Sequence, residues 1–181
     1  MMSRMLPALQ RWANWKVIII LVVLFLVFDF FILPAMASPG GETLPVLDLK
    51  FWYTPQQAFD AISQYSPQAR QASVVTHLTI DIIYPLVYGL LLSLLLIVVF
   101  RNAAPAQQYQ LPLLPWRAVI ADYLENVGLV AMFLLYPSQF PLLSWMTAIF
   151  TAIKWIQIGF SFLVLLAGIL LLILGKWKRR V

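Results

Sequence analysis

Residues 74–100 read VVTHLTIDIIYPLVYGLLLSLLLIVVF, an apolar run long enough to cross a lipid bilayer as a single helix. A transmembrane helix needs about 20 mostly apolar residues, and three further stretches of the chain meet that condition. The four predicted spans are residues 17–36, 74–100, 115–136 and 145–174. We therefore predict an all-α integral membrane protein, a four-transmembrane-helix bundle that forms one membrane domain over residues 1–181.

The composition points to the same class. The chain is 62% hydrophobic and 10% charged, with a mean hydropathy of +0.88. Soluble domains carry about 45–50% apolar and about 25% charged residues, so a soluble domain is excluded.

The lack of cysteine excludes disulfides, thiol catalysis and cysteine-ligated metal clusters. The basic residues form no patch interleaved with aromatic side chains outside the terminal runs, so we expect no nucleic-acid partner. We also expect no cofactor and no metal site.

The first span has a competing interpretation as a signal peptide, because Ala35-Met36-Ala37 resembles a cleavage site behind basic residues. However, the apolar stretch is longer than the roughly 7–15 residues of a signal sequence, and Asp29 interrupts it. We therefore expect an uncleaved transmembrane helix.

Residues 37–73 form the longest loop, and this loop contains one predicted helix. Thr54 is placed as its N-cap, Pro55 as its first residue, and Gln57 as the second partner of a capping box. Its apolar side chains are Ala58, Phe59, Ile62 and Tyr65. This pattern predicts a short amphipathic helix at the membrane–water interface, which covers the bundle or, alternatively, binds a partner.

Basic residues divide unequally between the two sides of the predicted bundle. One side carries Arg4, Arg11, Lys16, Arg101, Arg117, Lys176, Lys178, Arg179 and Arg180. The other side carries Lys50 and Arg70. Lys and Arg are in excess on the cytoplasmic side of membrane proteins. We therefore predict a multi-pass protein of the cell inner membrane, with both the N- and C-termini cytoplasmic and the loop 37–73 extracytoplasmic.

Each predicted span carries polar side chains, including four of the seven acidic residues of the chain. Ionisable groups within a membrane cost about 2.5–3.5 kcal/mol each, so they normally face the bundle interior or water. Helical spacing puts them on one face of each span, and we expect one shared polar interior. The candidate ligand-binding residues are Asp29, His77, Asp81, Tyr84, Tyr88, Asp122, Glu125, Asn126, Lys154 and Gln157.

Lys154 is the one cation deep inside a predicted span, since Arg117 lies at the start of its span, so Lys154 should pair with a carboxylate of a neighbouring helix. Asp81 is the first candidate, and Asp29 and Glu125 are the alternatives. We expect this pair to fix the packing of the helices rather than to act in catalysis. Pairing one lysine still leaves three carboxylates, which must be protonated, hydrated by a cavity, or bound to a cation.

Asp122 and Glu125 lie one helical turn apart and could share a proton or a hard cation. We expect both to face the interior and to border a cavity, with Asn126 orienting them, and a purely structural role is the alternative. His77 lies near the outer end of its span, where an interfacial hydrogen bond is expected rather than a role as a ligand.

Proline and glycine in the spans predict local features of the packing. Pro85 cannot donate a backbone hydrogen bond, so a carbonyl one turn earlier must be satisfied inside the bundle. Gly89 and Gly128 predict places where two helices approach closely.

Three stretches of the chain carry a family resemblance: DIIYPLVY at 81–88, DYLEN at 122–126 and Lys154-Trp155. Together they resemble small, uncharacterised four-span bacterial membrane proteins, over most of the chain from the loop helix onward. This resemblance implies the four-span fold and no particular activity. In architecture alone, the chain is also similar to the sterol-isomerase-like fold of emopamil-binding proteins, where acids inside a helical membrane bundle contact a lipid amine or sterol.

Three functions fit the predicted polar interior. The first is a lipid-binding or assembly subunit, with membrane lipids as partners and a homo-oligomer or larger membrane complex as its setting. The second is an intramembrane enzyme acting on a lipid, with Asp122 or Glu125 as acid or base and Lys154 as electrostatic stabiliser. The third is a proton- or cation-coupled carrier that uses the buried carboxylates. The sequence shows no nucleophile–base pair, no metal triad of histidine and carboxylates and no phosphate loop, which counts against the enzyme.

Overall fold

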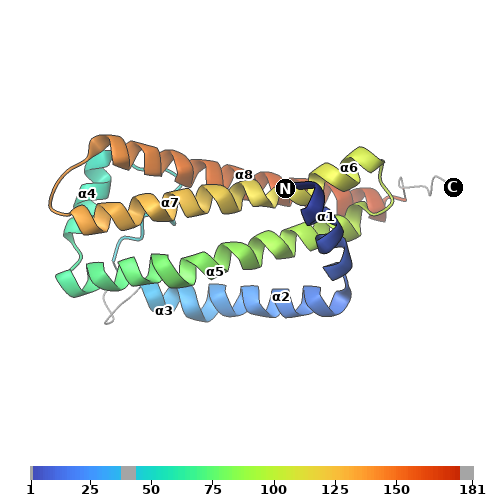
Figure 1. Cartoon of the computed structure of the whole chain (residues 1–181), viewed down its shortest axis with the longest axis horizontal. Helices are drawn as coiled ribbons and strands as arrows, with labels where there is room; N and C mark the ends of the chain where they lie inside the picture. The colour runs from blue at the N-terminus through green and yellow to red at the C-terminus, as the bar shows by residue number, and fades with distance from the viewer. Residues whose placement is uncertain (1, 38–43, 176–181) are drawn as a thin grey trace.

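The computed structural model describes residues 2–37 and 44–175 as a set of helices joined by short connections (Figure 1). In chain order these are α1 (Met2–Trp12), α2 (Trp15–Val27), a π-helical turn (Phe28–Ile32), α3 (Leu33–Ala37), α4 (Pro55–Ser63), α5 (Pro67–Phe100), α6 (Pro105–Gln110), a 3-10 turn (Leu111–Leu113), α7 (Pro115–Leu135) and α8 (Pro141–Ile173). Part of the predicted loop, at 38–43, and the basic run at 176–180 lie outside the described residues.

Four helical segments are long and apolar enough to span a membrane, as predicted. They are Trp15–Ala35, Pro67–Phe100, Gln107–Leu135 and Pro141–Ile173. α5 and α8 each begin earlier than expected, at a proline, because proline fits the first turn of a helix, where its missing N–H costs nothing. Ser66 caps α5 by accepting a hydrogen bond from the backbone N–H of Ala69 at 3.1 Å.

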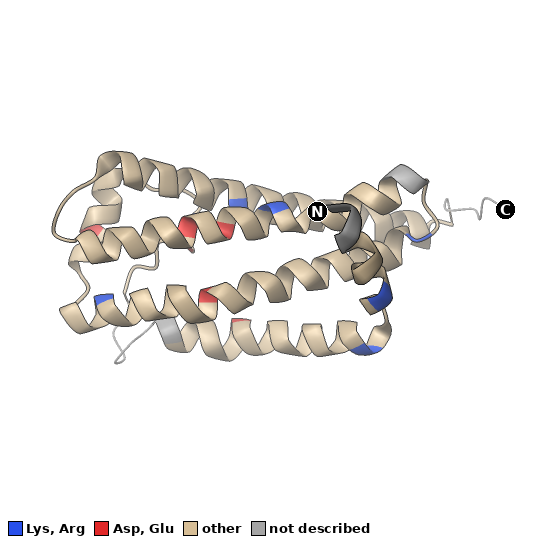
Figure 2. Cartoon of the chain, in the orientation of Figure 1, with Lys and Arg blue, Asp and Glu red and all other residues tan. Residues whose placement is uncertain are grey.

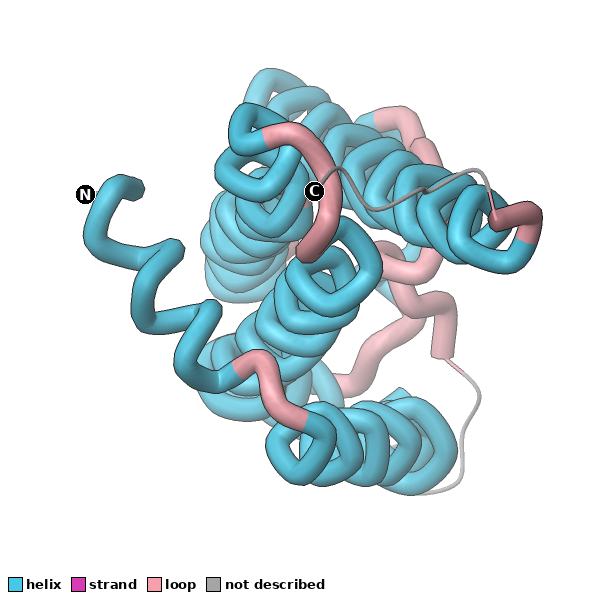
Figure 3. The backbone as a smooth tube through the Cα atoms, turned by 90° about the vertical axis from the view of Figure 1, so that its right-hand side faces the viewer, coloured by secondary structure: helices cyan, strands magenta, loops and turns pink. Residues whose placement is uncertain are grey.

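α5 and α7 form the centre of the bundle. In their most apolar stretches, 56% of the residues are buried, against 11% for the first span and 17% for α8. α8 packs along α7, and α2 packs chiefly against α5, so the order across the bundle is α8, α7, α5, α2 (Figure 1). Figure 3 shows the long helices nearly end-on. This order leaves α2 and α8 at the outside with large apolar surfaces.

Two glycines allow the central helices to approach their neighbours, as predicted from their small size. A Cβ atom built on Gly89 would lie 2.5 Å from Cγ2 of Val119, and one on Gly128 would lie 2.9 Å from Cγ2 of Thr147. Both separations are far below van der Waals contact, so any larger residue would push α5 from α7 or α7 from α8.

Pro85 leaves the carbonyl of Asp81 without its helical partner, and a neighbouring helix supplies one. Asn126 Nδ2 on α7 donates to that carbonyl at 3.1 Å. Nearby, the Tyr123 hydroxyl donates to the carbonyl of Ile82 at 2.8 Å. The freed carbonyl of Asp81 is therefore satisfied inside the bundle, as expected. The hydrogen bond from Asn126 also links α7 to α5.

The loop helix α4 begins where the capping sequence predicts. Thr54 Oγ1 accepts from the Gln57 backbone N–H at 3.2 Å, and Gln57 Oε1 accepts from the Thr54 N–H at 2.9 Å. The helix buries Ala58, Ala61 and Ile62 in a cluster with side chains from the ends of α7 and α8. It therefore covers one end of the bundle (Figure 1).

α1 and α6 were not predicted, and both lie at the end of the bundle away from α4 (Figure 1). α1 buries Leu6 and Leu9, and Leu9 belongs to a cluster with α2 and α5. α6 begins at Pro105, between the second and third predicted spans.

Candidate functional site

A cavity of about 410 Å³ lies among α2, α5, α7, α8 and the loop before α4. Toward the end of the bundle where α2 begins, its lining is apolar, whereas the rest of its lining mixes polar side chains with apolar ones such as Leu129 and Phe133. The polar wall is made by Asp29, Asp48, Ser73, Thr76, His77, Asp81, Tyr84, Tyr88, Asp122 and Lys154. The apolar wall includes Phe25, Leu91, Leu92, Leu95, Ile158 and Phe162. The shared polar interior predicted from the spans is thus one side of a larger amphipathic cavity.

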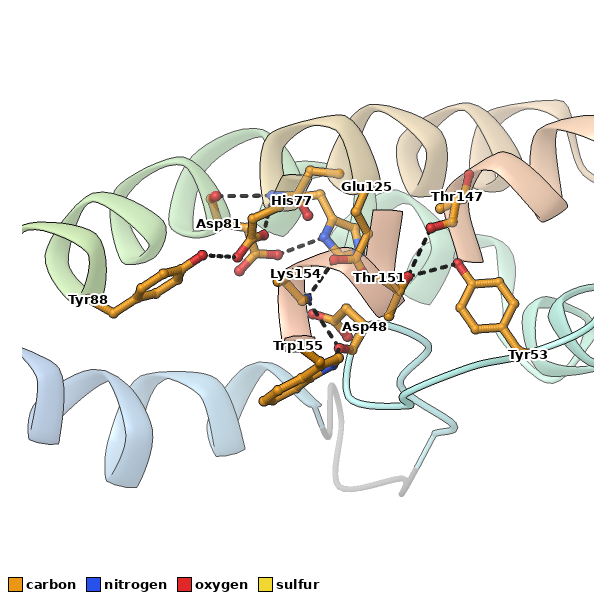
Figure 4. A network of polar contacts seen from close by, with 12 residues as sticks. Asp48, Tyr53, His77, Asp81, Tyr88, Glu125, Thr147, Thr151, Lys154 and Trp155 are labelled. Atoms are coloured by element: carbon orange, nitrogen blue, oxygen red, sulfur yellow. Dashed lines mark hydrogen bonds and ion pairs between the residues drawn. The ribbon is translucent and has the colours of Figure 1, made fainter. Parts of the chain in front are cut away.

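The loop segment at 46–49 forms part of the cavity wall, which the sequence did not predict. The carbonyl of Asp48 accepts hydrogen bonds from Lys154 Nζ and Trp155 Nε1, each at 3.2 Å (Figure 4). Leu47 is buried in the core beneath α4. These contacts hold the Asp48 carboxylate beside the acids of α5 and α7.

Tyr65, two residues after α4, fixes the beginning of the same loop. Its hydroxyl donates to the carbonyl of Pro45 at 3.0 Å. Burial and the negative charge of Asp48 raise the pKa of the Tyr65 phenol to about 12, so this group remains a hydrogen-bond donor at neutral pH. Hydrogen bonds to the carbonyls of Pro45 and Asp48 therefore hold the cavity-lining part of the loop near both of its ends.

Lys154 pairs with Glu125 rather than with the expected Asp81. Its Nζ lies 2.6 Å from Glu125 Oε2, and both side chains are buried (Figure 4). Asp81 instead contacts His77 one turn earlier on its own helix. Helical periodicity predicted the face on which each residue lies, but it did not fix which turns of α5, α7 and α8 stand at the same height.

Glu125 does not border the cavity, so this part of the expectation is wrong. The residue is 0% exposed and is absent from the described residues that line the cavity. Its Oε1 accepts from Thr151 at 2.8 Å, and the Tyr53 hydroxyl lies 3.5 Å from Thr151. Burial raises the pKa of Tyr53, so its hydroxyl keeps its proton. Glu125 thus links α7, α8 and the loop as a structural group.

Asp122 does line the cavity, as expected. Its Oδ2 accepts from the Tyr88 hydroxyl at 2.9 Å, and its Oδ1 lies 3.4 Å from Asn126 Nδ2. Asn126 therefore orients Asp122 but makes no hydrogen bond to Glu125 among the described residues. The two acids, predicted to act as a pair, have separate partners.

His77 is buried in the cavity wall. It is 9% exposed, and its Nδ1 lies 2.7 Å from Asp81 Oδ2. Asp48 completes a group in which one ligand atom of each residue lies within 4.8 Å of the others. The sequence pattern predicts no triad of histidine and carboxylates. The structure shows one, because its third member, Asp48, comes from a loop.

Asp29 reaches the cavity from the first span, and Tyr84 faces it from α5. The Tyr84 hydroxyl donates to Asp29 Oδ1 at 2.9 Å. Asp29 lies in the π-helical turn Phe28–Ile32. Gln157 lies outside the described cavity lining, as does Asn126.

The charges around the cavity do not balance. Asp29, Asp48, Asp81 and Asp122 line it, Glu125 lies behind it, and Lys154 is the sole permanent cation among the described lining residues. Figure 2 shows that most acidic residues gather in the half of the bundle that carries α4. Electrostatics therefore favour a cation, or a group with hydrogen-bond donors, beside the polar wall.

No family model, curated protein or solved structure matches this chain. The resemblance to small four-span bacterial membrane proteins stays a prediction.

Proposed function

We propose that this chain is a lipid-binding protein of the bacterial inner membrane, whose cavity takes up one membrane amphiphile. A single observation carries the proposal: one cavity joins a wall of acids and tyrosines to a wall of leucine, isoleucine and phenylalanine. The headgroup would lie beside Asp81 and Asp122, and the acyl chain beside Leu91, Leu95 and Phe162. The volume of about 410 Å³ falls within the range of about 300–1,000 Å³ for small-molecule sites.

The arrangement of the helices is consistent with entry of this ligand from the bilayer. α2 packs chiefly on α5, and α8 packs on α7, so the cavity lies between two outer helices with exposed apolar faces. A lipid could enter between them without crossing water.

The proposed topology has four spans, cytoplasmic termini, and α4 as an interfacial helix outside the cell. It rests on the excess of basic residues at the end of the bundle where α2 begins and α8 ends (Figure 1). Cysteines at Gln57 and Asn102, which are both exposed, should react with an impermeant thiol reagent from opposite sides, Gln57 from outside. Labelling of both from one side would contradict this topology.

Lipid binding is tested by filling the apolar end of the cavity. Leu95→Trp places a larger side chain in the lining, whereas Leu86→Trp makes the same change at an outward position of α5 that is 42% exposed. After purification in mild detergent, native mass spectrometry should show one tightly bound lipid on the wild type and on Leu86→Trp, and a marked loss on Leu95→Trp. Equal lipid occupancy in the two variants would contradict the proposal.

A second candidate, an enzyme acting on a lipid by acid–base chemistry, is favoured by the position of Asp122. This carboxylate borders the cavity, accepts a hydrogen bond from Tyr88, and would contact a bound headgroup. Lys154 also lines the cavity and could stabilise negative charge, whereas Glu125 lies behind the wall. Turnover of lipids in nanodiscs by the wild type but not by Asp122→Asn would support the enzyme, and unchanged lipids with both would exclude it.

A further inference from the structure

Three side chains with metal-binding chemistry converge in the polar wall of the cavity. One ligand atom from each of Asp48, His77 and Asp81 lies within 4.8 Å of the other two (Figure 4). We propose that this Asp48–His77–Asp81 cluster binds a divalent first-row transition-metal cation, with Zn²⁺ as the best fit. The proposal does not depend on lipid binding, since a cation can occupy this wall whether or not an amphiphile fills the cavity.

The donor set fits such a cation. One imidazole nitrogen and two carboxylates are ligands that Zn²⁺ accepts, and three protein ligands leave a position open to the cavity. Purely oxygen-binding cations such as Mg²⁺ and Ca²⁺ have less use for the imidazole. The histidine therefore favours a transition metal.

The cluster has the properties of a built site rather than of a surface accumulation of acids. His77 and Asp81 are 9% and 8% exposed. His77 Nδ1 lies 2.7 Å from Asp81 Oδ2. Asp48 Oδ1 is buried with no hydrogen-bond partner in the described part of the chain. A cation bound to the cluster would give this oxygen the partner that it lacks.

The third ligand, Asp48, is not on α5, and contacts with α8 and the core hold it in place. The Asp48 backbone carbonyl is fixed by Lys154 and Trp155 of α8, and its neighbour Leu47 is buried in the core. A loop carboxylate directed toward two buried ligands would otherwise add repulsion at a site already rich in acids. A bound cation removes that cost and offsets part of the uncompensated negative charge around the cavity.

The competing interpretation is an ion pair between a protonated His77 and Asp81, with Asp48 as a bystander. Such a pair has no need of a metal and predicts no zinc uptake. Zinc binding to the purified protein therefore separates the two interpretations.

The experiment uses the full chain in mild detergent, purified with an affinity tag that contains no histidine. After treatment with a chelator, ZnCl₂ alone is added, and bound zinc is measured by elemental analysis and isothermal titration calorimetry. We expect one zinc per chain. His77→Gln and Asp48→Asn should each weaken binding by about 100-fold or more, because loss of an outer-shell partner already costs about 10–100-fold.

The matched control is Asp29→Asn, which removes the same charge from the same cavity but is not part of the cluster. It should retain one zinc with an affinity close to that of the wild type. Equal losses in Asp29→Asn and Asp48→Asn would mean that only the total charge matters, and this would overturn the site.

X-ray absorption at the zinc edge of the wild type keeps the proposal testable even if a variant does not fold. The sequence contains one histidine and no cysteine, so the expected spectrum shows one imidazole, oxygen ligands and no sulfur. Zinc without an imidazole ligand, or no zinc uptake at all, would refute the proposal. Neither result would bear on lipid occupancy, which is measured separately.

Discussion

Replacing Lys154 by methionine should destabilise the bundle, because it leaves the Glu125 carboxylate buried without its ion-pair partner. The two groups are 2.6 Å apart, a separation at which the Coulomb attraction is about 6 kcal/mol for an effective dielectric constant of about 20. Desolvation of both groups offsets most of this attraction. Removing one partner nevertheless costs about 3–5 kcal/mol, since the other charge is no longer compensated.

The other contacts of Lys154 change this value little. The Asp48 carbonyl, which accepts from Lys154, also accepts from Trp155 at 3.2 Å and so keeps a donor. For a chain of this size, 1 kcal/mol corresponds to about 2–4 °C in Tm, so we expect Tm to fall by about 6–20 °C.

The assay is thermal unfolding in mild detergent, followed by far-ultraviolet circular dichroism. Lys50→Met is the matched control, because Lys50 is exposed, and its Tm should equal that of the wild type. The double variant Lys154→Met/Glu125→Leu removes both charges, and the Thr151 hydroxyl, whose single proton no longer goes to Glu125, can donate to the carbonyl of Thr147 at 3.0 Å. It should recover most of the lost stability. A single variant as stable as Lys50→Met, or a double variant no better than the single one, would refute the reasoning.

Two further substitutions test the packing. Gly128→Ala should lower the free energy of unfolding by about 1–3 kcal/mol through overpacking against α8. Gly159→Ala is the control, because no atom lies within 4 Å of a Cβ built there. In the same unfolding assay it should be neutral or stabilising by up to about 1 kcal/mol. Asn126→Ala should cost about 1–3 kcal/mol, because it removes the donor to the carbonyl that Pro85 leaves unpaired. The cost should shrink in a Pro85→Ala background, where the helix supplies its own N–H, and equal costs in both backgrounds would contradict this role.

The sequence predicts the helices well because their physical causes are local. The length of the apolar runs, the capping box at Thr54 and Gln57, and the backbone effect of Pro85 depend on neighbouring residues alone. Periodicity also placed His77 and Asp81 on one face of α5, where the structure has them.

The pairing of buried charges depends on causes that are not local. Whether Lys154 meets Asp81 or Glu125 is decided by how far α8 is shifted along α7 and α5, and close contacts such as Gly128 with Thr147 set that shift. Asp48 has no periodic pattern around it, since its position follows from the path of a loop. The one feature of the sequence that could have indicated the role of Asp48 is its position near aromatic residues, in a loop expected to cover the bundle.

The π-helical turn at Phe28–Ile32 has an evolutionary consequence for the cavity. The backbone N–H of Leu33 bonds to the carbonyl of Phe28, so this turn holds one residue more than an α-helical turn would. An extra residue rotates everything beyond it by roughly 100° about the helix axis. Loss or gain of a single codon directly before Asp29 would therefore turn its carboxylate to another face of the helix, while the sequence of α2 and its packing on α5 stay as they are. Variation in ligand preference could arise by insertion and deletion at this turn, without substitution of any other residue of the cavity.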